Sequence, residues 1–98
     1  MAEYTKEQFW KLYKALPQEL KDALFAEATG DDIYEILEKN KALGSLEKVV
    51  ELTGQVLLGI LPPDDFATEV QQQTKLKKAV AEKVAREITR FVIYPVKP

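Results

Sequence analysis

The sequence contains no cysteine and no histidine among its 98 residues. Without cysteine it cannot form a disulfide, a zinc–thiolate site or a thiol nucleophile. Without histidine it lacks the commonest metal ligand and the usual general base of hydrolases. Calcium-binding acidic loops and the Gly-Lys-Ser/Thr ending of a phosphate loop are also missing. We therefore expect a protein that is not an enzyme and that holds no metal and no cofactor.

An excess of one charge and a long hydrophobic run are missing as well. The chain has 14 Lys and Arg against 16 Asp and Glu, a formal net charge of −2. This balance provides no general attraction to nucleic acid or to an anionic membrane. The longest nearly uncharged stretch, 52–63, is about half the ~20 residues of a membrane span. The polar, acidic start, MAEYTKEQFW, is unlike a signal peptide, so we expect a cytosolic protein without a membrane partner.

What the sequence does have is apolar residues at helical spacing. Hydrophobic residues make up 46% of the chain and charged residues 31%, a balance typical of one globular domain. The spacing predicts helices at about 5–16 and 17–27, then a third that Thr29 or Asp31 caps, that carries Ile33, Ile36 and Leu37 and that Gly44 closes, and further helices at about 46–61, 66–73 and 74–94. Breaks are expected at 28–32, at Gly44 and at 62–65, where glycine, proline or capping residues stand. We predict an all-α fold, a compact single-domain bundle of five or six helices over residues 1–98.

The helix predicted at 46–61 is apolar on nearly all sides, which is typical of a buried central helix. Ser45 is expected to cap its start. Gly54 and Gly59 fall inside it, where each glycine costs about 1 kcal/mol relative to alanine. Close approach of a neighbouring helix would offset that cost. We therefore expect this segment to lie at the centre of the bundle.

Two acidic pairs, Asp31-Asp32 and Asp64-Asp65, stand at predicted helix starts. A carboxylate at this position accepts hydrogen bonds from unpaired backbone N–H groups and faces the positive end of the helix dipole. A metal site would need further oxygen ligands at defined spacing, and none is present. We interpret both pairs as caps.

The last predicted helix is amphipathic. Val84, Ile88, Phe91 and Val92 share its apolar face, at 100° per residue. Five cations form candidate phosphate contacts on the other side: Lys75, Lys78, Lys83, Arg86 and Arg90. Glu82 and Glu87 follow Lys78 and Lys83 at i,i+4, the pattern of a solvated helix face. Nucleic-acid binding through this face is therefore the alternative function, behind protein–protein interaction.

Candidate partner-binding residues lie near both ends of the chain: Trp10, Ile93 and Tyr94. Trp10 lies 100° away from the stripe formed by Phe9 and Tyr13, so it either fills a second groove or meets a partner. Ile93 has the same wheel angle as Lys75 and would face water in an isolated monomer. Either an N-terminal helix or a second subunit must cover this region. We expect intramolecular cover and a monomer, because so short a chain needs its apolar surface for its own core.

Two segments, 54–66 and 84–96, carry the patterns LLGxxxPxxF and A…ExxxxxxxPV. An earlier LPxxLxxxLF…E pattern is matched by Leu16, Pro17, Leu20, Leu24, Phe25 and Glu27. In these features the chain resembles a family of small all-helical proteins of candidate-phyla bacteria, to which no activity is assigned. The resemblance implies a helical fold and no functional site. The chain stops soon after Pro95-Val96, where such proteins are expected to continue, which favours a trimmed or engineered chain.

Overall fold

The computed structural model describes residues 7, 11, 14–15, 17–18 and 27–96. Four longer helices make up most of this part: α3 (Glu27–Lys39), α4 (Leu46–Leu57), α5 (Phe66–Gln73) and α6 (Lys78–Ile88). Between and after them come the 3₁₀ turns η1 (Leu43–Ser45) and η2 (Pro63–Asp65), the π-helix η3 (Thr89–Ile93) and the short α7 (Tyr94–Val96). No strand occurs in the described ranges, which confirms the all-α class for them.

The predicted number of five or six helices is not confirmed. The helices expected at 5–16 and 17–27 fall mostly outside the described residues. The break expected at 28–32 is wrong, because α3 runs without interruption from Glu27 through Asp31 and Asp32. These two carboxylates therefore lie inside a helix and do not cap one.

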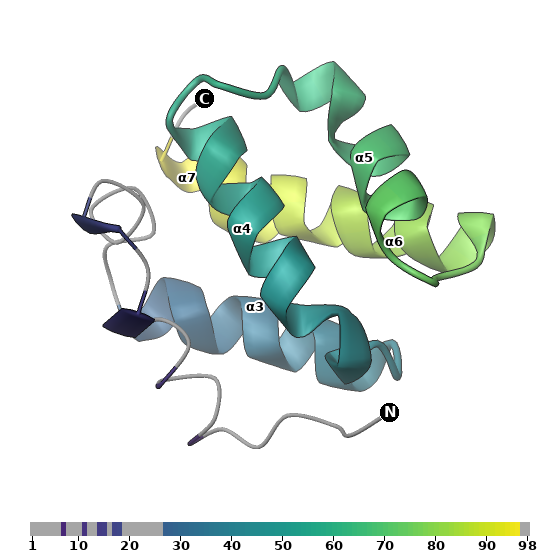
Figure 1. Ribbon diagram of the computed structural model, residues 1–98, viewed down its shortest axis with the longest axis horizontal. Coiled ribbons are helices and arrows are strands. Elements are labelled where there is room, and N and C mark those ends of the chain that lie inside the picture. Colours follow the sequence, from purple (N-terminus) through teal and green to yellow (C-terminus); the bar gives the residue numbers. More distant parts are fainter. Residues whose placement is uncertain (1–6, 8–10, 12–13, 16, 19–26, 97–98) are drawn as a thin grey trace.

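The helices are arranged around one hydrophobic core. The continuous stretch α6–η3 lies between α3 and α5, and α4 packs against α3, α5 and η3. In Figure 1, α4 crosses in front of the yellow-green α6–η3–α7 stretch, with α3 and α5 on opposite sides of it. The largest side chains of the core are fully buried: Phe66, Ile33, Leu37, Leu46, Leu52, Ile88, Ile93, Val49, Val50 and Val56. In this packing α6 contacts α3 and α5, and η3 contacts α3 and α4.

The central helix is shorter than the predicted 46–61. It begins at Leu46 as expected, but it ends at Leu57. Gly59 adopts a positive φ of 78°, the left-handed conformation that glycine takes most easily. The N–H of Ile60 bonds to the carbonyl of Gln55 at 2.9 Å and the N–H of Gly59 to that of Val56 at 3.0 Å, which is a Schellman cap. Gly59 is therefore a helix terminator, and the role predicted for it inside a helix is wrong.

Helix α3 ends by the same motif without a glycine. Lys41 has φ 57°, and the N–H of Ala42 bonds to the carbonyl of Leu37 at 2.7 Å. In residues other than glycine, the Cβ atom makes this left-handed conformation unfavourable by about 1–2 kcal/mol, because it lies too close to the following carbonyl oxygen. Gly44, the predicted end of this helix, instead lies in η1 without a positive φ. The left-handed residue that follows α3 is therefore Lys41, three residues before the expected Gly44.

Replacing Lys41 with glycine is expected to stabilise the protein. The free energy of unfolding should rise by about 0.5–1 kcal/mol, because glycine removes the strain of the left-handed conformation. Glycine also gives the unfolded chain more conformational entropy, which cancels part of this stabilisation. Urea titration of the parent and Lys41→Gly measures the change. Gly44→Ala serves as the control and should not lower stability, since its backbone does not need glycine. A loss of stability in Lys41→Gly would contradict this account of the helix end.

The stretch after α6 departs from α-helical geometry. Over Thr89–Ile93 the backbone bonds i→i+5, as in the bond from the N–H of Tyr94 to the carbonyl of Thr89. The hydroxyl of Thr89 also donates to the carbonyl of Ala85 at 2.7 Å, where the α-helix gives way to the π-helix. The wider turn buries the consecutive residues Val92 and Ile93. It leaves Phe91 and Tyr94 on the outside.

This geometry corrects the placement of Ile93. A constant step of 100° puts Ile93 beside the cations and Phe91 in the apolar stripe. In the structure Ile93 is 1% exposed and Phe91 is 52% exposed. The two residues exchange sides because a π-helix advances less than 100° per residue. Ile93 is thus a core residue, and its side chain is not available to a partner.

Candidate functional site

Two exposed aromatic residues lie on the outer side of η3 and the start of α7. Phe91 and Tyr94 are 52% and 58% exposed there, whereas most large apolar residues of the described part are buried. The guanidinium of Arg90 stands over the ring of Phe91, 5.4 Å from its centroid. Leu58 and Ile60, in the turn after α4, are the other exposed large hydrophobic residues. We refer to the outer side of η3 and the start of α7, where Phe91 and Tyr94 are exposed, as the η3 face.

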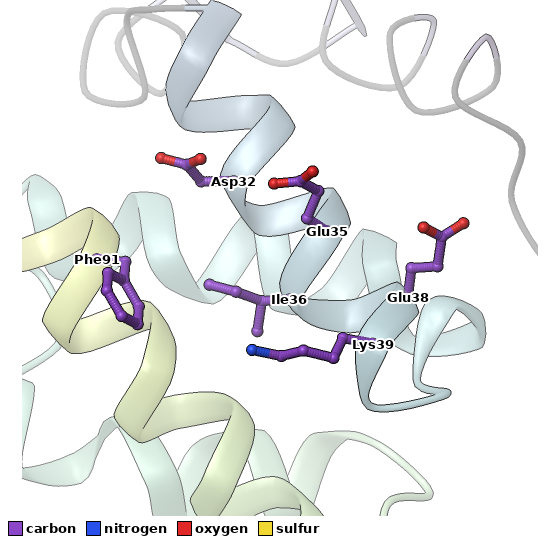
Figure 2. A pocket seen from close by; sticks show the side chains of 6 residues that line it. All are labelled: Asp32, Glu35, Ile36, Glu38, Lys39 and Phe91. Carbon is purple, nitrogen blue, oxygen red and sulfur yellow. The ribbon is translucent and has the colours of Figure 1, made fainter.

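One groove runs between α3 and η3, with a volume of about 540 Å³. Its described lining residues are Asp32, Glu35, Ile36, Glu38, Lys39 and Phe91. Figure 2 shows Ile36 pointing from α3 toward Phe91, while the carboxylates of Asp32, Glu35 and Glu38 follow one another along α3. The spacing i, i+3, i+6 keeps these three residues on one side of the helix. We call this the acidic groove.

Lys39, the one cation among the described lining residues of the acidic groove, is already engaged. Lys39 forms an ion pair with Glu87 of α6, and the amide of Asn40 donates to the other Glu87 oxygen at 2.8 Å. The Asn40 amide also donates to the carbonyl of Ile36 at 2.7 Å. The Glu87 side chain is 14% exposed, and its contacts with Lys39 and Asn40 connect the end of α3 to α6. Asp32, Glu35 and Glu38 form none of the ion pairs found among the described residues.

Glu87 has a perturbed pKa. Burial acts to raise the pKa of this carboxyl, but the hydrogen bonds from Lys39 and Asn40 and the charges of Lys39 and Lys83 lower it, and the net shift is downward. A carboxyl with a lowered folded-state pKa stabilises the fold above its unfolded value of about 4.3. That contribution is lost as the pH falls through the folded-state pKa.

Glu87→Gln is therefore expected to be destabilising in a pH-dependent way. At pH 7 the loss should be about 1 kcal/mol, the value of one charged hydrogen-bonded contact that is partly screened by solvent. The difference between parent and variant should shrink as the pH is lowered from about 5 to about 3. Thermal melts over this range provide the measurement. In Glu82→Gln, which removes an exposed ion pair with Lys78, the corresponding difference should be smaller at every pH. A stability difference between the parent and Glu87→Gln that does not change with pH would refute a lowered pKa of Glu87 as its cause.

A second groove lies on the other side of η3, against the start of α5, with a volume of about 530 Å³. Its described lining residues are Pro63, Phe66, Ala67, Glu82, Ala85, Arg86, Thr89, Arg90 and Tyr94. Phe66 and Ala85 form a buried apolar floor, and Arg86, Arg90 and Tyr94 are exposed at the rim. Glu82 lies 4.0 Å from Lys78, whereas Arg86 and Arg90 form no ion pair within the described residues. We call this the basic groove.

The structure does not keep the predicted basic face together. Lys75 lies in the loop before α6, because α5 continues to Gln73 and α6 begins only at Lys78. There it lines a third groove with residues of η1 and the start of α4. Lys78 is close to Glu82, and Lys83 contributes to the field around Glu87. Arg86 and Arg90 alone meet in one groove.

The predicted partner-binding residues also have different outcomes. Trp10 lies outside the described residues. Ile93 is buried, and Tyr94 is exposed in the basic groove. Sequence reasoning missed Phe91 and the row of Asp32, Glu35 and Glu38. A signal was present in both cases: four consecutive apolar residues at 91–94, and three acids at i, i+3, i+6 on one helix.

Comparison with known proteins adds no further assignment. This chain matches no protein-family model, no curated protein and no solved structure. The resemblance to helical proteins of candidate-phyla bacteria therefore stays a prediction. No helix in the described part of the chain has the length and hydrophobicity to cross a membrane. The described ranges also hold no group of three or more Asp or Glu side chains placed to bind a metal ion.

Proposed function

We propose that this chain is a non-catalytic protein-interaction module that binds its partner through the η3 face. The observation that carries the proposal is the pair of exposed aromatic residues, Phe91 and Tyr94, between two grooves. Aromatic residues at the surface are costly in water and are enriched in the centres of protein interfaces. The proposal that the chain is not an enzyme rests on the sequence, which has neither histidine nor cysteine. The expected cytosolic location stays a prediction.

The two grooves have the character of protein-binding sites. Each combines an apolar part, Ile36 in one and Phe66 with Ala85 in the other, with charged side chains at the rim. An apolar centre with a charged rim is the usual composition of a specific protein interface. Arginine and tyrosine are, with tryptophan, the residues most often found at energetic hot spots. A partner that covers the η3 face would bury Phe91 and Tyr94 and give Arg86 and Arg90 acidic neighbours.

Nucleic-acid binding has less support from the arrangement of the cations. A phosphate-binding surface needs several cations along one path, and here Lys75, Lys78 and Lys83 point to three different neighbourhoods. Arg86 and Arg90 remain as a pair, flanked by Glu82. We retain nucleic acid as an outcome of the test.

A library of random peptides of about 15 residues, long enough to fill a groove of this size, provides the probe. We expect selected peptides to combine a large apolar residue with acidic residues, and to bind the double variant Phe91→Ala/Tyr94→Ala at least about tenfold more weakly. Leu58→Ala/Ile60→Ala is the matched control, since it removes two other exposed apolar side chains, and it should bind normally. Peptides that bind all three proteins equally would refute the η3 face as the site.

Random-sequence duplex DNA and single-stranded RNA serve as the competing probes, at about 50 and about 200 mM salt. The proposal predicts weak binding that Lys83→Glu/Arg86→Glu barely changes. Submicromolar binding that falls steeply with salt and is lost in this variant would replace protein binding by nucleic-acid binding as the function.

A further inference from the structure

The two grooves beside η3 carry opposite charges. On the α3 side stand Asp32, Glu35 and Glu38, and on the α5 side stand Arg86 and Arg90. The remaining charged residues of the grooves have neighbours of opposite sign, Lys39 with Glu87 and Glu82 with Lys78. What is left is three carboxylates on one side of η3 and two guanidiniums on the other. None of these five residues forms an ion pair within the described part of the chain.

We infer that both grooves open on the side of the α6–η3 stretch that faces away from α4. Their described lining residues come from η3 and from the helices beside it, and none comes from α4. Helix α4 packs against η3, within which Val92 and Ile93 are buried, whereas Phe91 and Tyr94 are exposed. The surface is therefore acidic on the α3 side, aromatic at the η3 face and basic on the α5 side.

We propose that the η3 face is covered by a second copy of this chain, with the acidic groove of each copy against the basic groove of the other. This rests on the proposed function, that the η3 face binds protein, and it names the partner. A surface with an acidic and a basic side is complementary to itself under a two-fold rotation, the commonest symmetry of soluble dimers. The small net charge of −2 adds little repulsion between copies.

The order of the charges selects one orientation of the two copies. A two-fold axis that runs along η3 exchanges the two sides of the surface, so acid faces base at both edges. A two-fold axis that lies in the interface across η3 would place acid on acid and base on base. In the proposed dimer, the two η3 helices are therefore parallel. Phe91 and Tyr94 of both copies meet at the centre, where aromatic pairs are favourable.

The spacing of the charges fits this arrangement. At about 1.5 Å per residue, Asp32 and Glu38 are about 9 Å apart along α3, and Arg86 and Arg90 are about 6 Å apart along the α6–η3 stretch. The two arginines and the three carboxylates therefore have comparable spacings along their helices, as pairing between the two rows requires. Arginine–carboxylate pairs form two parallel hydrogen bonds, which gives the contact direction as well as strength. Because such pairs near the surface are screened by salt, the dimer should weaken as salt is added.

The sequence predicts a monomer because so short a chain needs its apolar surface for its own core, and Ile93 is buried within the chain. Phe91 and Tyr94 nevertheless stay exposed, so the core does not use this part of the apolar surface. Intramolecular cover of Ile93 and association through the η3 face are therefore compatible.

Charge exchange between copies tests the proposal. Arg86→Glu/Arg90→Glu makes both sides of the surface acidic, and Glu35→Lys/Glu38→Lys makes both sides basic. In analytical ultracentrifugation at low salt, we expect the parent to dimerise with rising concentration. Each double variant alone should dimerise at least about tenfold more weakly, and an equimolar mixture of the two should form a heterodimer. Melting curves confirm that both variants, which change exposed residues, remain folded.

Lys75→Glu/Lys77→Glu is the matched control. It alters two exposed lysines before α6 and changes the net charge by the same amount as the arginine variant, so it should dimerise like the parent. A parent dimer that survives in both charge variants would place the interface elsewhere and overturn the proposal. A parent that stays monomeric, with no association in the mixture, would overturn it as well. If selected peptides still required Phe91 and Tyr94 in that case, the proposed protein-binding function would stand and only the second copy would be wrong.

Discussion

Val84→Asp is expected to unfold the domain at 25 °C. Val84 is 0% exposed on α6, the helix that packs against both α5 and α3. The buried residues of the described part are apolar apart from Thr53, so a carboxylate at this position finds no buried cation among them, which costs several kcal/mol. Domains of this size are stable by about 5–15 kcal/mol, so the cost is of the order of the whole stability. Loss of most of the helical circular dichroism signal provides the measurement.

Ala79→Asp is the control for this substitution. It introduces the same side chain into the same helix, but at an exposed position in its first turn. There the carboxylate is hydrated and faces the positive end of the helix dipole, so the change in stability should be within about 0.5 kcal/mol. If Val84→Asp melted within a few degrees of Ala79→Asp, the packing of α6 described above would be wrong.

The second large effect is expected at Gly54. This glycine is buried in α4, directly after the buried residues Leu52 and Thr53. Three consecutive buried positions span more than half of the helix circumference, at 100° per residue, so neighbours approach α4 from several sides. The hydroxyl of Thr53 is satisfied within the helix by the carbonyl of Val49, at 2.7 Å. A larger side chain at Gly54 therefore has no open direction.

Gly54→Leu should lower the free energy of unfolding by about 1–3 kcal/mol or more, because the added side chain overfills a packed core. Gly54→Ala should cost less, since its better helix propensity, about 1 kcal/mol, offsets part of the strain. Gly44→Leu is the control, with leucine placed at an exposed glycine, and it should be within about 0.5 kcal/mol of the parent. Urea titration compares all three. A Gly54→Leu variant as stable as the parent would show that no close packing requires glycine there.

Helix positions could be predicted from the sequence where the signal is local. The start of α4 at Leu46 and the span of α5 follow from apolar spacing and from Pro62-Pro63, as predicted. The ends of α3 and α4 could not. A helix often ends with a residue in the left-handed conformation, and this residue is usually glycine. The sequence therefore favours Gly44 at the end of α3, but Lys41 takes this conformation. The apolar run 58–61 continued the pattern of α4 past Gly59, although its backbone no longer does.

The candidate site could be predicted only in fragments. Arg86, Arg90 and Tyr94 were each visible as candidates, because charge and aromatic character belong to the residue itself. Their common groove depends on the contact between α5 and α6, which no local pattern contains. The acidic groove depends likewise on α3 lying beside η3. Phe91 was misplaced because a helical wheel assumes one constant step, and η3 does not have it.

The π-helix also has a consequence for comparing this chain with related sequences. A turn that bonds i→i+5 holds one residue more than an α-helical turn of the same position. A related chain with one residue fewer between 89 and 93 would return to α-helical bonding and still deliver the following residues to the same place. A single-residue gap at this point of an alignment would therefore mark a local change in winding within an unchanged fold. Column-by-column matching across such a gap would pair an exposed position such as Phe91 with a buried one, and would conceal the surface on which the proposed interaction depends.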